Sequence, residues 1–321
     1  MNYKLKKISG DASFREFYRV QKNNECTIIV LAKKDKYKNL TVYSAVNEIL
    51  NKNKILAPKL INNFLKNDII EISDLGKISF FDYIKKKKNK TKDYKKLIDL
   101  IVKLQKIKLK QKYKFLGKIV NFKKYSVNEL HRESDLFFDW YLQSFIKKKK
   151  KLSIIKFKIK NELIKKYKIL HFKNLYFTQR DFHTSNIMIS KNKFGLIDSQ
   201  DAIIGNPMYD VVSLIDDVRI KIPQKTQSDL FKYYISKSKF KKEDHLNLKN
   251  DFDILSVQRN LKILGIFVRL YKRDKKPNYL KYLPYTWKLI EARLRNPIFK
   301  NLKSILDINL SIKKIKKVKF K

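Results

Sequence analysis

Three polar side chains between Phe177 and Asp201 have the types and spacing suited to phosphoryl transfer. Asp181 is followed five residues later by Asn186, and Asp198 comes twelve residues after that, directly behind an apolar run. An Asp in a tight loop can accept the proton of an attacking hydroxyl, while an amide oxygen and a second carboxylate can hold Mg²⁺ against nucleotide phosphates. The spacing therefore predicts Asp181 as the catalytic base and Asn186 and Asp198 as metal ligands.

The order of the surrounding motifs separates this segment from ordinary turns, in which Asp and Asn are also common. R-D-x-H-x-x-N from Arg180 is followed by an apolar hairpin, by I-D-x-Q-D from Ile197 and by G-x-P-x-Y-D from Gly205. A single D-x-x-x-x-N spacing would occur often by chance, whereas the ordered set favours a phosphotransfer site. His183 in the first motif is predicted to be structural.

These motifs resemble the catalytic and metal loops of the aminoglycoside phosphotransferase and choline kinase superfamily. More narrowly, the chain resembles the anomeric N-acetylmuramate/N-acetylglucosamine kinases of bacterial cell-wall recycling. The matching stretches, in the order that this family shows, are GDASFREFYRV at 10–20, SDLG at 73–76, DLFFDWYL at 135–142 and GIFVRLYKRDKKPNYL at 265–280. The resemblance implies an α+β, two-lobed protein-kinase-like fold. We expect a small β-rich nucleotide-binding lobe at 1–76 and a larger helical lobe at 77–321.

The resemblance also implies an activity: transfer of the γ-phosphoryl group of ATP, with Mg²⁺, to the anomeric hydroxyl of N-acetylmuramate or N-acetylglucosamine. Three alternatives remain open. One is a kinase for another small acceptor, such as an aminoglycoside, choline or homoserine. The others are a kinase-like binding protein without turnover and a protein that binds polyanions through its lysines.

The first lobe begins with two β-rich runs, FREFYRV at 14–20 and CTIIVLA at 26–32, which predict a hairpin. In a kinase-like fold the turn between the first strands covers the nucleotide phosphates, so Gly10 and Ser13 are candidate phosphate contacts. The run that ends at Ser73 and Asp74 resembles the hinge whose backbone groups bind adenine.

The cation that binds the phosphates is harder to assign. Kinase-like folds place a Lys on the third strand, but here IIVLAKK puts Lys33 at or past the strand end. Arg15, Arg19 and Lys33 are therefore all candidates, with Arg15 among the predicted cofactor-binding residues. A following helix carries Glu48, which either pairs with such a cation or faces solvent.

The second lobe is predicted to be helical from Phe80 to Leu175 and again from about residue 224 onward, by its three- and four-residue apolar spacing. An aromatic helix segment at 135–142 fits core packing. By resemblance it also helps to form the acceptor pocket, with Asp135 and Trp140 as sugar contacts. Arg273, in a link between two helices, is a third substrate candidate.

Two residues depart from the pattern of the family. Gln179 stands where the family usually has His, and Ser199 stands where an aromatic follows the metal-binding Asp. Gln179 can still form local hydrogen bonds, whereas the small Ser199 side chain lacks the packing contacts of an aromatic ring. These departures affect the expected rigidity of the loops more than their chemistry.

A net charge of +46 is typical of proteins that bind nucleic acid, but 66 of the 76 basic residues here are lysines dispersed along the chain. Phosphate clamps favour clustered Arg, so we expect no specific nucleic-acid partner. One cysteine, Cys26, precludes an internal disulfide. With no apolar run long enough for a membrane span, the expectation is a cytoplasmic monomer acting on a small sugar.

Overall fold

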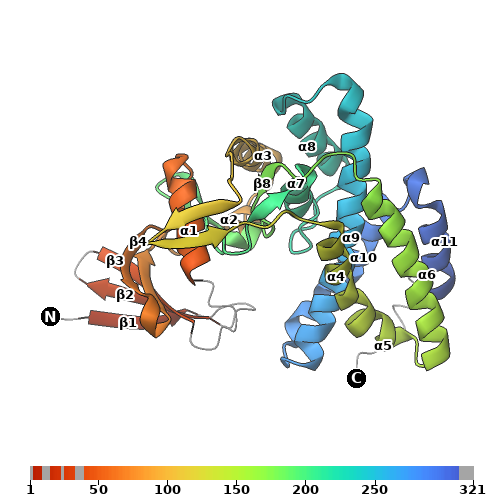
Figure 1. Cartoon of the computed structure of the whole chain (residues 1–321), viewed down its shortest axis with the longest axis horizontal. Coiled ribbons are helices and arrows are strands. Elements are labelled where there is room, and N and C mark those ends of the chain that lie inside the picture. Colours follow the sequence, from red (N-terminus) through yellow and green to blue (C-terminus); the bar gives the residue numbers. More distant parts are fainter. Residues whose placement is uncertain (1–2, 9–14, 23–24, 33–39, 311–321) are drawn as a thin grey trace. The chain divides into compact units, whose positions relative to one another are not determined.

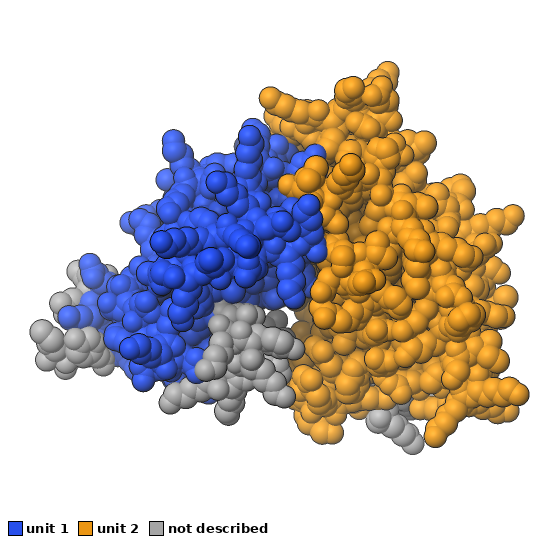
Figure 2. All heavy atoms as spheres, in the orientation of Figure 1, with its two compact units in different colours: residues 1–124, 176–204 blue, residues 125–175, 205–321 orange. Residues whose placement is uncertain are grey.

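The computed structural model describes residues 3–8, 15–22, 25–32 and 40–310. The chain divides into two compact units, coloured separately in Figure 2, with unit 1 formed by 1–124 and 176–204 and unit 2 by 125–175 and 205–321. These units do not follow the predicted division after residue 76, because 77–124 and the catalytic segment belong with the N-terminal strands. The lobe boundary at residue 76 stays a prediction.

Unit 1 contains a five-stranded antiparallel sheet in the order β1-β2-β3-β5-β4 (Figure 1). Its strands are β1 (Tyr3–Ile8), β2 (Glu16–Lys22), β3 (Glu25–Leu31), β4 (Leu60–Phe64) and β5 (Ile69–Ser73). The predicted hairpin is confirmed as β2 and β3, with Phe17 opposite Val30.

The core of this sheet follows from the period of two along its strands. On β3 the buried side chains are Ile28 and Val30, and on β5 they include Ile70. Helix α1 (Leu40–Lys52) packs on them with Tyr43, which is 3% exposed. The alternating strands and this amphipathic helix therefore share one apolar layer.

The remainder of unit 1 mixes helices with short hairpins. Its elements are α2 (Phe80–Lys85), α3 (Thr91–Gln105), β6 (Lys112–Phe115), β7 (Lys118–Asn121), β8 (Tyr176–Thr178), the 3₁₀ turn Thr184–Asn186, β9 (Ile187–Ser190), β10 (Lys193–Leu196) and β11 (Ile203–Gly205). The last residue of β11, Gly205, belongs to unit 2. The prediction of continuous helix from Phe80 to Leu175 is wrong at β6 and β7. These strands pair antiparallel around Leu116 and Gly117, both at positive φ of 47° and 73°. Two such residues form the turn that a two-residue hairpin favours.

Unit 2 is helical, as predicted. Its elements are α4 (Val127–Leu136), a π-helical turn (Phe137–Leu142), α5 (Gln143–Phe145), α6 (Lys149–Lys168), α7 (Met208–Ile215), α8 (Gln224–Lys237), α9 (His245–Lys272), α10 (Leu283–Arg293) and α11 (Lys300–Leu310), with 3₁₀ turns at Lys242–Asp244, Pro277–Tyr282 and Pro297–Phe299. Among the described residues, no helix is long and apolar enough to cross a membrane.

The long helix α9 packs closely against the junction of α4 and the π-helical turn. A Cβ built on Gly265 would lie 2.2 Å from the carbonyl carbon and oxygen of Leu136, so only a glycine allows this approach. Phe137 and Tyr141 of the turn are fully buried, and the Tyr141 ring stacks on Trp287 at 6.1 Å. The core-packing interpretation of the aromatic segment is therefore confirmed for these rings.

Candidate active site

The loop after β8, which carries Asp181 and Asn186, lies beside the segment after β10 that carries Asp198. The Asn186 backbone N–H donates to the His183 carbonyl at 2.9 Å, and the Asn186 carbonyl accepts from the Ile197 N–H at 3.0 Å. The Asn186 side-chain Nδ2 donates to the Asp181 carbonyl at 3.2 Å. Asn186 therefore ties the Asp181 loop to the strand end immediately before Asp198.

Asp198 is held in a backbone conformation that few residues adopt. Its φ is +58°, and Arg180 in the facing loop has a φ of +71°. Left-handed backbone at non-glycine residues costs free energy and is frequent at functional sites. The fully buried Gln179 supports it, because its Nε2 donates to the carbonyls of Ile197 at 3.2 Å and Asp198 at 3.4 Å. The prediction that Gln179 forms local hydrogen bonds is confirmed.

The second departure, Ser199, has a partner that sequence reasoning did not find. Its Oγ donates to the Asn47 Oδ1 on α1 at 2.7 Å, and both side chains are buried. No motif marks Asn47. The neighbouring Glu48 accepts instead from Lys52 at 2.7 Å and from the Tyr113 hydroxyl. Helix α1 thus reaches the loop of Asp198 through the Asn47 amide. Glu48, which was expected to pair with the phosphate-binding cation or to face solvent, pairs with Lys52 instead.

The electrostatics of the loop favour a bound cation. Burial raises the pKa of Asp198, the nearby Asp181 carboxylate raises it further, and the Arg15 guanidinium acts in the opposite direction. Two neighbouring carboxylates disfavour each other's charge, and a bound divalent cation would stabilise the charged form of both.

The donor set fits Mg²⁺ completed by nucleotide phosphates. Because Asn186 uses its Nδ2 on the backbone, its Oδ1 is the side-chain atom left to serve as a ligand beside the Asp198 carboxylate. Within the described ranges, His, Cys, Asp and Glu form no cluster of three or more with metal-binding geometry. Mg²⁺ in kinase sites needs only one or two protein ligands, since phosphates and waters supply the rest.

Arg15 lies beside the predicted metal ligand. Its Nη1 is 3.8 Å from the Asp198 Oδ1 and donates to the Gln200 Oε1 at 3.0 Å. Gln200 in turn donates from Nε2 to Asp198 Oδ1 at 3.0 Å and to Asp201 Oδ2 at 3.1 Å. The I-D-x-Q-D motif contained Gln200, but sequence reasoning gave it no role.

The side chains of the hinge candidates form hydrogen bonds within the protein. Arg19 forms a two-atom ion pair with Asp74, with Nη2 to Oδ1 at 3.1 Å, and also donates to the Gly76 carbonyl at 2.9 Å. The Ser73 hydroxyl accepts from the Lys59 N–H at 2.8 Å. Adenine binding by the backbone at Ser73 and Asp74 stays a prediction. Three further candidates lie outside the described residues: Gly10, Ser13 and Lys33.

Two of the substrate candidates lie close together in sequence, on α4 and the π-helical turn of unit 2. Asp135 forms an ion pair with Lys160 of α6, so its charge is already partly compensated. Trp140 is only partly buried, and its carbonyl accepts from the Ser144 hydroxyl at 2.8 Å. Trp140 is therefore the ring of this segment that core packing does not fully account for.

Arg273, the third candidate, caps the end of α9. It is exposed and pairs with Asp274 through two nitrogens at 2.7 and 3.0 Å. The preceding Lys272 donates to the Ser144 hydroxyl at 3.1 Å, so the end of α9 lies beside the helix that follows Trp140.

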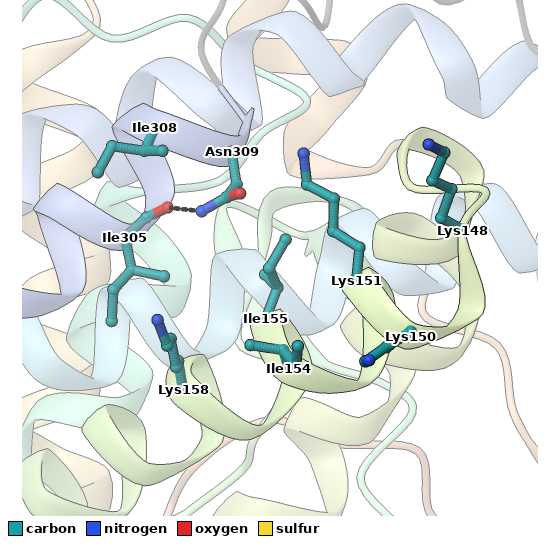
Figure 3. A pocket seen from close by; sticks show the side chains of 9 residues that line it. All are labelled: Lys148, Lys150, Lys151, Ile154, Ile155, Lys158, Ile305, Ile308 and Asn309. Carbon is teal, nitrogen blue, oxygen red and sulfur yellow. Dashed lines mark hydrogen bonds between the residues drawn. The ribbon is translucent and has the colours of Figure 1, made fainter.

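A separate pocket opens between α6 and α11 of unit 2, as Figure 3 shows. Its lining residues are Lys148, Lys150, Lys151, Ile154, Ile155, Lys158, Ile305, Ile308 and Asn309. None of them is a carboxylate or a predicted site residue. This pocket therefore supplies neither a base nor a ligand for Mg²⁺.

The fold and these loops define a phosphotransferase. The chain belongs to the phosphotransferase enzyme family (APH), which it matches over residues 4–243. The superfamily resemblance read from the motifs is confirmed.

The relatives agree with the narrower resemblance. The chain is 26% identical to the N-acetylmuramate/N-acetylglucosamine kinase of Pseudomonas aeruginosa over 314 residues, covering 93% of this chain and 86% of the relative. It is 23% identical to the enzyme of the same name from Neisseria meningitidis serogroup B, covering 88% of this chain and 83% of the relative.

Solved structures confirm the kinase-like fold. The microcompartment-associated aminopropanol kinase matches with a TM-score of 0.63 at 13% identity, covering 94% of this chain and 95% of that one. The choline kinase LicA from Streptococcus pneumoniae matches with a TM-score of 0.61 at 12% identity, covering 90% and 93%. The spectinomycin phosphotransferase APH(9)-Ia, solved with ADP and spectinomycin, matches with a TM-score of 0.56 at 12% identity, covering 94% and 92%.

Proposed function

We propose that this protein is an ATP-dependent sugar kinase that phosphorylates the anomeric hydroxyl of N-acetylmuramate or N-acetylglucosamine in peptidoglycan recycling. The observation that carries the proposal is the similarity, over most of the chain, to relatives that bear this name. The proposal is supported by the two neighbouring loops that carry Asp181, Asn186 and Asp198, residue types suited to a base and to metal ligands.

Asp181 acts as the base in this proposal. Its carboxylate accepts the proton of the sugar hydroxyl as the sugar oxygen forms a bond to the γ-phosphorus, and the bond from that phosphorus to the β–γ bridging oxygen breaks to release ADP. An anomeric hydroxyl is more acidic than an ordinary alcohol, so a carboxylate of modest basicity suffices. Positioning and electrostatic stabilisation provide most of the rate enhancement.

Asn186 and Asp198 hold Mg²⁺ in this proposal, and the ion neutralises charge on the phosphates when it is bound. The ADP in a solved relative of the same fold supports nucleotide use. Asp135, Trp140 and Arg273 are proposed to line the acceptor site, with the Trp140 ring against the apolar face of the sugar. We also propose that the protein acts in the cytoplasm, where ATP is supplied, and that it acts as a monomer.

Acceptor-dependent ADP release tests the proposal. Purified protein is incubated with Mg·ATP and, separately, N-acetylmuramate, N-acetylglucosamine, choline or kanamycin, beside the Asp181→Asn variant. We expect release only with the amino sugars and its loss in the variant. Release with choline or kanamycin alone would replace the sugar by another acceptor, and ATP binding without release would indicate a kinase-like protein without turnover.

A further inference from the structure

The site contains a buried cation to which the proposed reaction assigns no role. The Arg15 side chain is only 9% exposed, yet its guanidinium lies 3.8 Å from the Asp198 Oδ1. That separation allows electrostatic attraction but exceeds a direct hydrogen bond. If Asp198 holds Mg²⁺ against nucleotide phosphates, a group within 4 Å of its carboxylate lies beside those phosphates.

The position of Arg15 in the sheet brings it near the end of the third strand. β2 and β3 run antiparallel, with Glu16 opposite Leu31, so Arg15, directly before β2, lies near Ala32, directly after β3. A cation from the start of β2 can therefore reach the region where kinase-like folds place their third-strand lysine.

Arg19, the other described candidate for this role, lies further along the chain, within β2. Arg19 is fixed to Asp74 through two nitrogens and to the Gly76 carbonyl, at the end of β5. Its hydrogen bonds stabilise the turn after that strand. Arg19 is therefore a matched control for Arg15. It is a half-buried arginine on β2, and its partners belong to the turn after β5.

We propose that Arg15 is the cation that binds the nucleotide phosphates, in place of a third-strand lysine, and that Gln200 positions it. The inference rests on the proposed ATP-dependent function. A guanidinium presents a planar fork that can donate two hydrogen bonds to phosphate oxygens, whereas an ammonium acts as a point charge.

Gln200 explains how this cation and the metal ligand keep a fixed spacing. Its Oε1 accepts from Arg15, and its Nε2 donates to both Asp198 and Asp201. One buried amide thus orients a cation and two carboxylates at once. With Mg²⁺ on Asp198, the Arg15 guanidinium would donate to the phosphate oxygens, and Gln200 would keep Arg15 beside Asp198.

The test is the ratio of ADP affinity to adenosine affinity, measured in the presence of Mg²⁺ by calorimetry and, for weak binding, by NMR titration. Arg15→Gln keeps a polar contact to Gln200 but removes the charge. We expect it to weaken ADP binding about 10- to 100-fold, the range for a lost charge-assisted hydrogen bond, while adenosine binding stays unchanged. Arg15→Lys restores the charge without the fork, and its ratio should lie between those of Arg15→Gln and the unaltered protein.

The control is Arg19→Gln, which should lower the melting temperature and change ADP and adenosine affinity together. An unchanged ratio in Arg15→Gln, or an Arg15→Lys ratio no higher than that of Arg15→Gln, would overturn the inference. A failure of the proposed function would show itself by a different result. Unaltered protein that binds ADP but forms no sugar phosphate would contradict the sugar kinase and leave the role of Arg15 intact.

Discussion

Replacing Ser199 with alanine should loosen the loop that carries Asp198, because it removes the hydrogen bond that links this loop to α1. Both partners are buried, Ser199 at 0% and Asn47 at 2% exposure, and the bond is 2.7 Å long. The variant leaves the Asn47 Oδ1 without its donor in a site closed to water. Stranding a buried acceptor costs about 1–3 kcal/mol, so the free energy of unfolding should fall by that amount.

Urea denaturation of a double-mutant cycle measures the bond itself. Asn47→Ala and Ser199→Ala break the same interaction, so the double variant should lose less stability than the two single losses added, with a coupling of about 1 kcal/mol. The rate of sugar-dependent ADP release should also fall in Ser199→Ala, because Asp198 precedes this residue.

Ser44 provides a matched control on the same helix. It is 2% exposed, and its hydroxyl makes no hydrogen bond within the part of the chain that the structure describes. Because it removes a buried hydroxyl that has no partner, Ser44→Ala should leave the free energy of unfolding unchanged or raise it. Equal losses in Ser44→Ala and Ser199→Ala, or strictly additive effects of Asn47→Ala and Ser199→Ala, would refute the reasoning.

Two predictions concern unit 2. Gly265→Ala should lower the free energy of unfolding by more than the ~1–3 kcal/mol of ordinary overpacking, because the new Cβ would meet the Leu136 backbone at 2.2 Å. The better helix propensity of alanine offsets only a small part of this loss. A urea unfolding curve close to that of the unaltered protein would contradict the close helix contact. Burial raises the pKa of Asp251 above 3.8 although the backbone N–H groups of His171 and Phe172 oppose the shift. The folded protein then keeps this proton to a higher pH than the unfolded chain, so stability should fall as pH rises from about 3.8 through the raised value. Asp251→Asn should remove that part of the pH dependence in urea unfolding, and identical slopes for both proteins would count against it.

The sequence predicted the elements whose apolar period is regular. Alternation defined the β2–β3 hairpin, and three- and four-residue spacing defined the helices of unit 2. The β6–β7 hairpin was missed because it lies inside a lysine-rich helical region and its strands have four residues each. Its turn residues, Leu116 and Gly117, were the available signal.

Motif spacing selected Asp181, Asn186 and Asp198, which lie on two neighbouring loops, and their roles stay predictions. The partnership of Ser199 with Asn47 joins positions 152 residues apart, and no local pattern encodes such a contact. The substrate contacts stay predictions, because they depend on tertiary contacts that no local pattern encodes.

The proposed reaction transfers a phosphoryl group to the anomeric oxygen of the sugar, with Asp181 as base. The most direct measurement is the ³¹P–¹H correlation NMR spectrum of the product formed from Mg·ATP and N-acetylglucosamine, with the methyl glycoside of the same sugar as the matched acceptor. We expect the phosphorus to couple to the anomeric proton, no product from the methyl glycoside, and none from the Asp181→Asn variant. Coupling to the C6 protons, or phosphorylation of the methyl glycoside, would contradict the account.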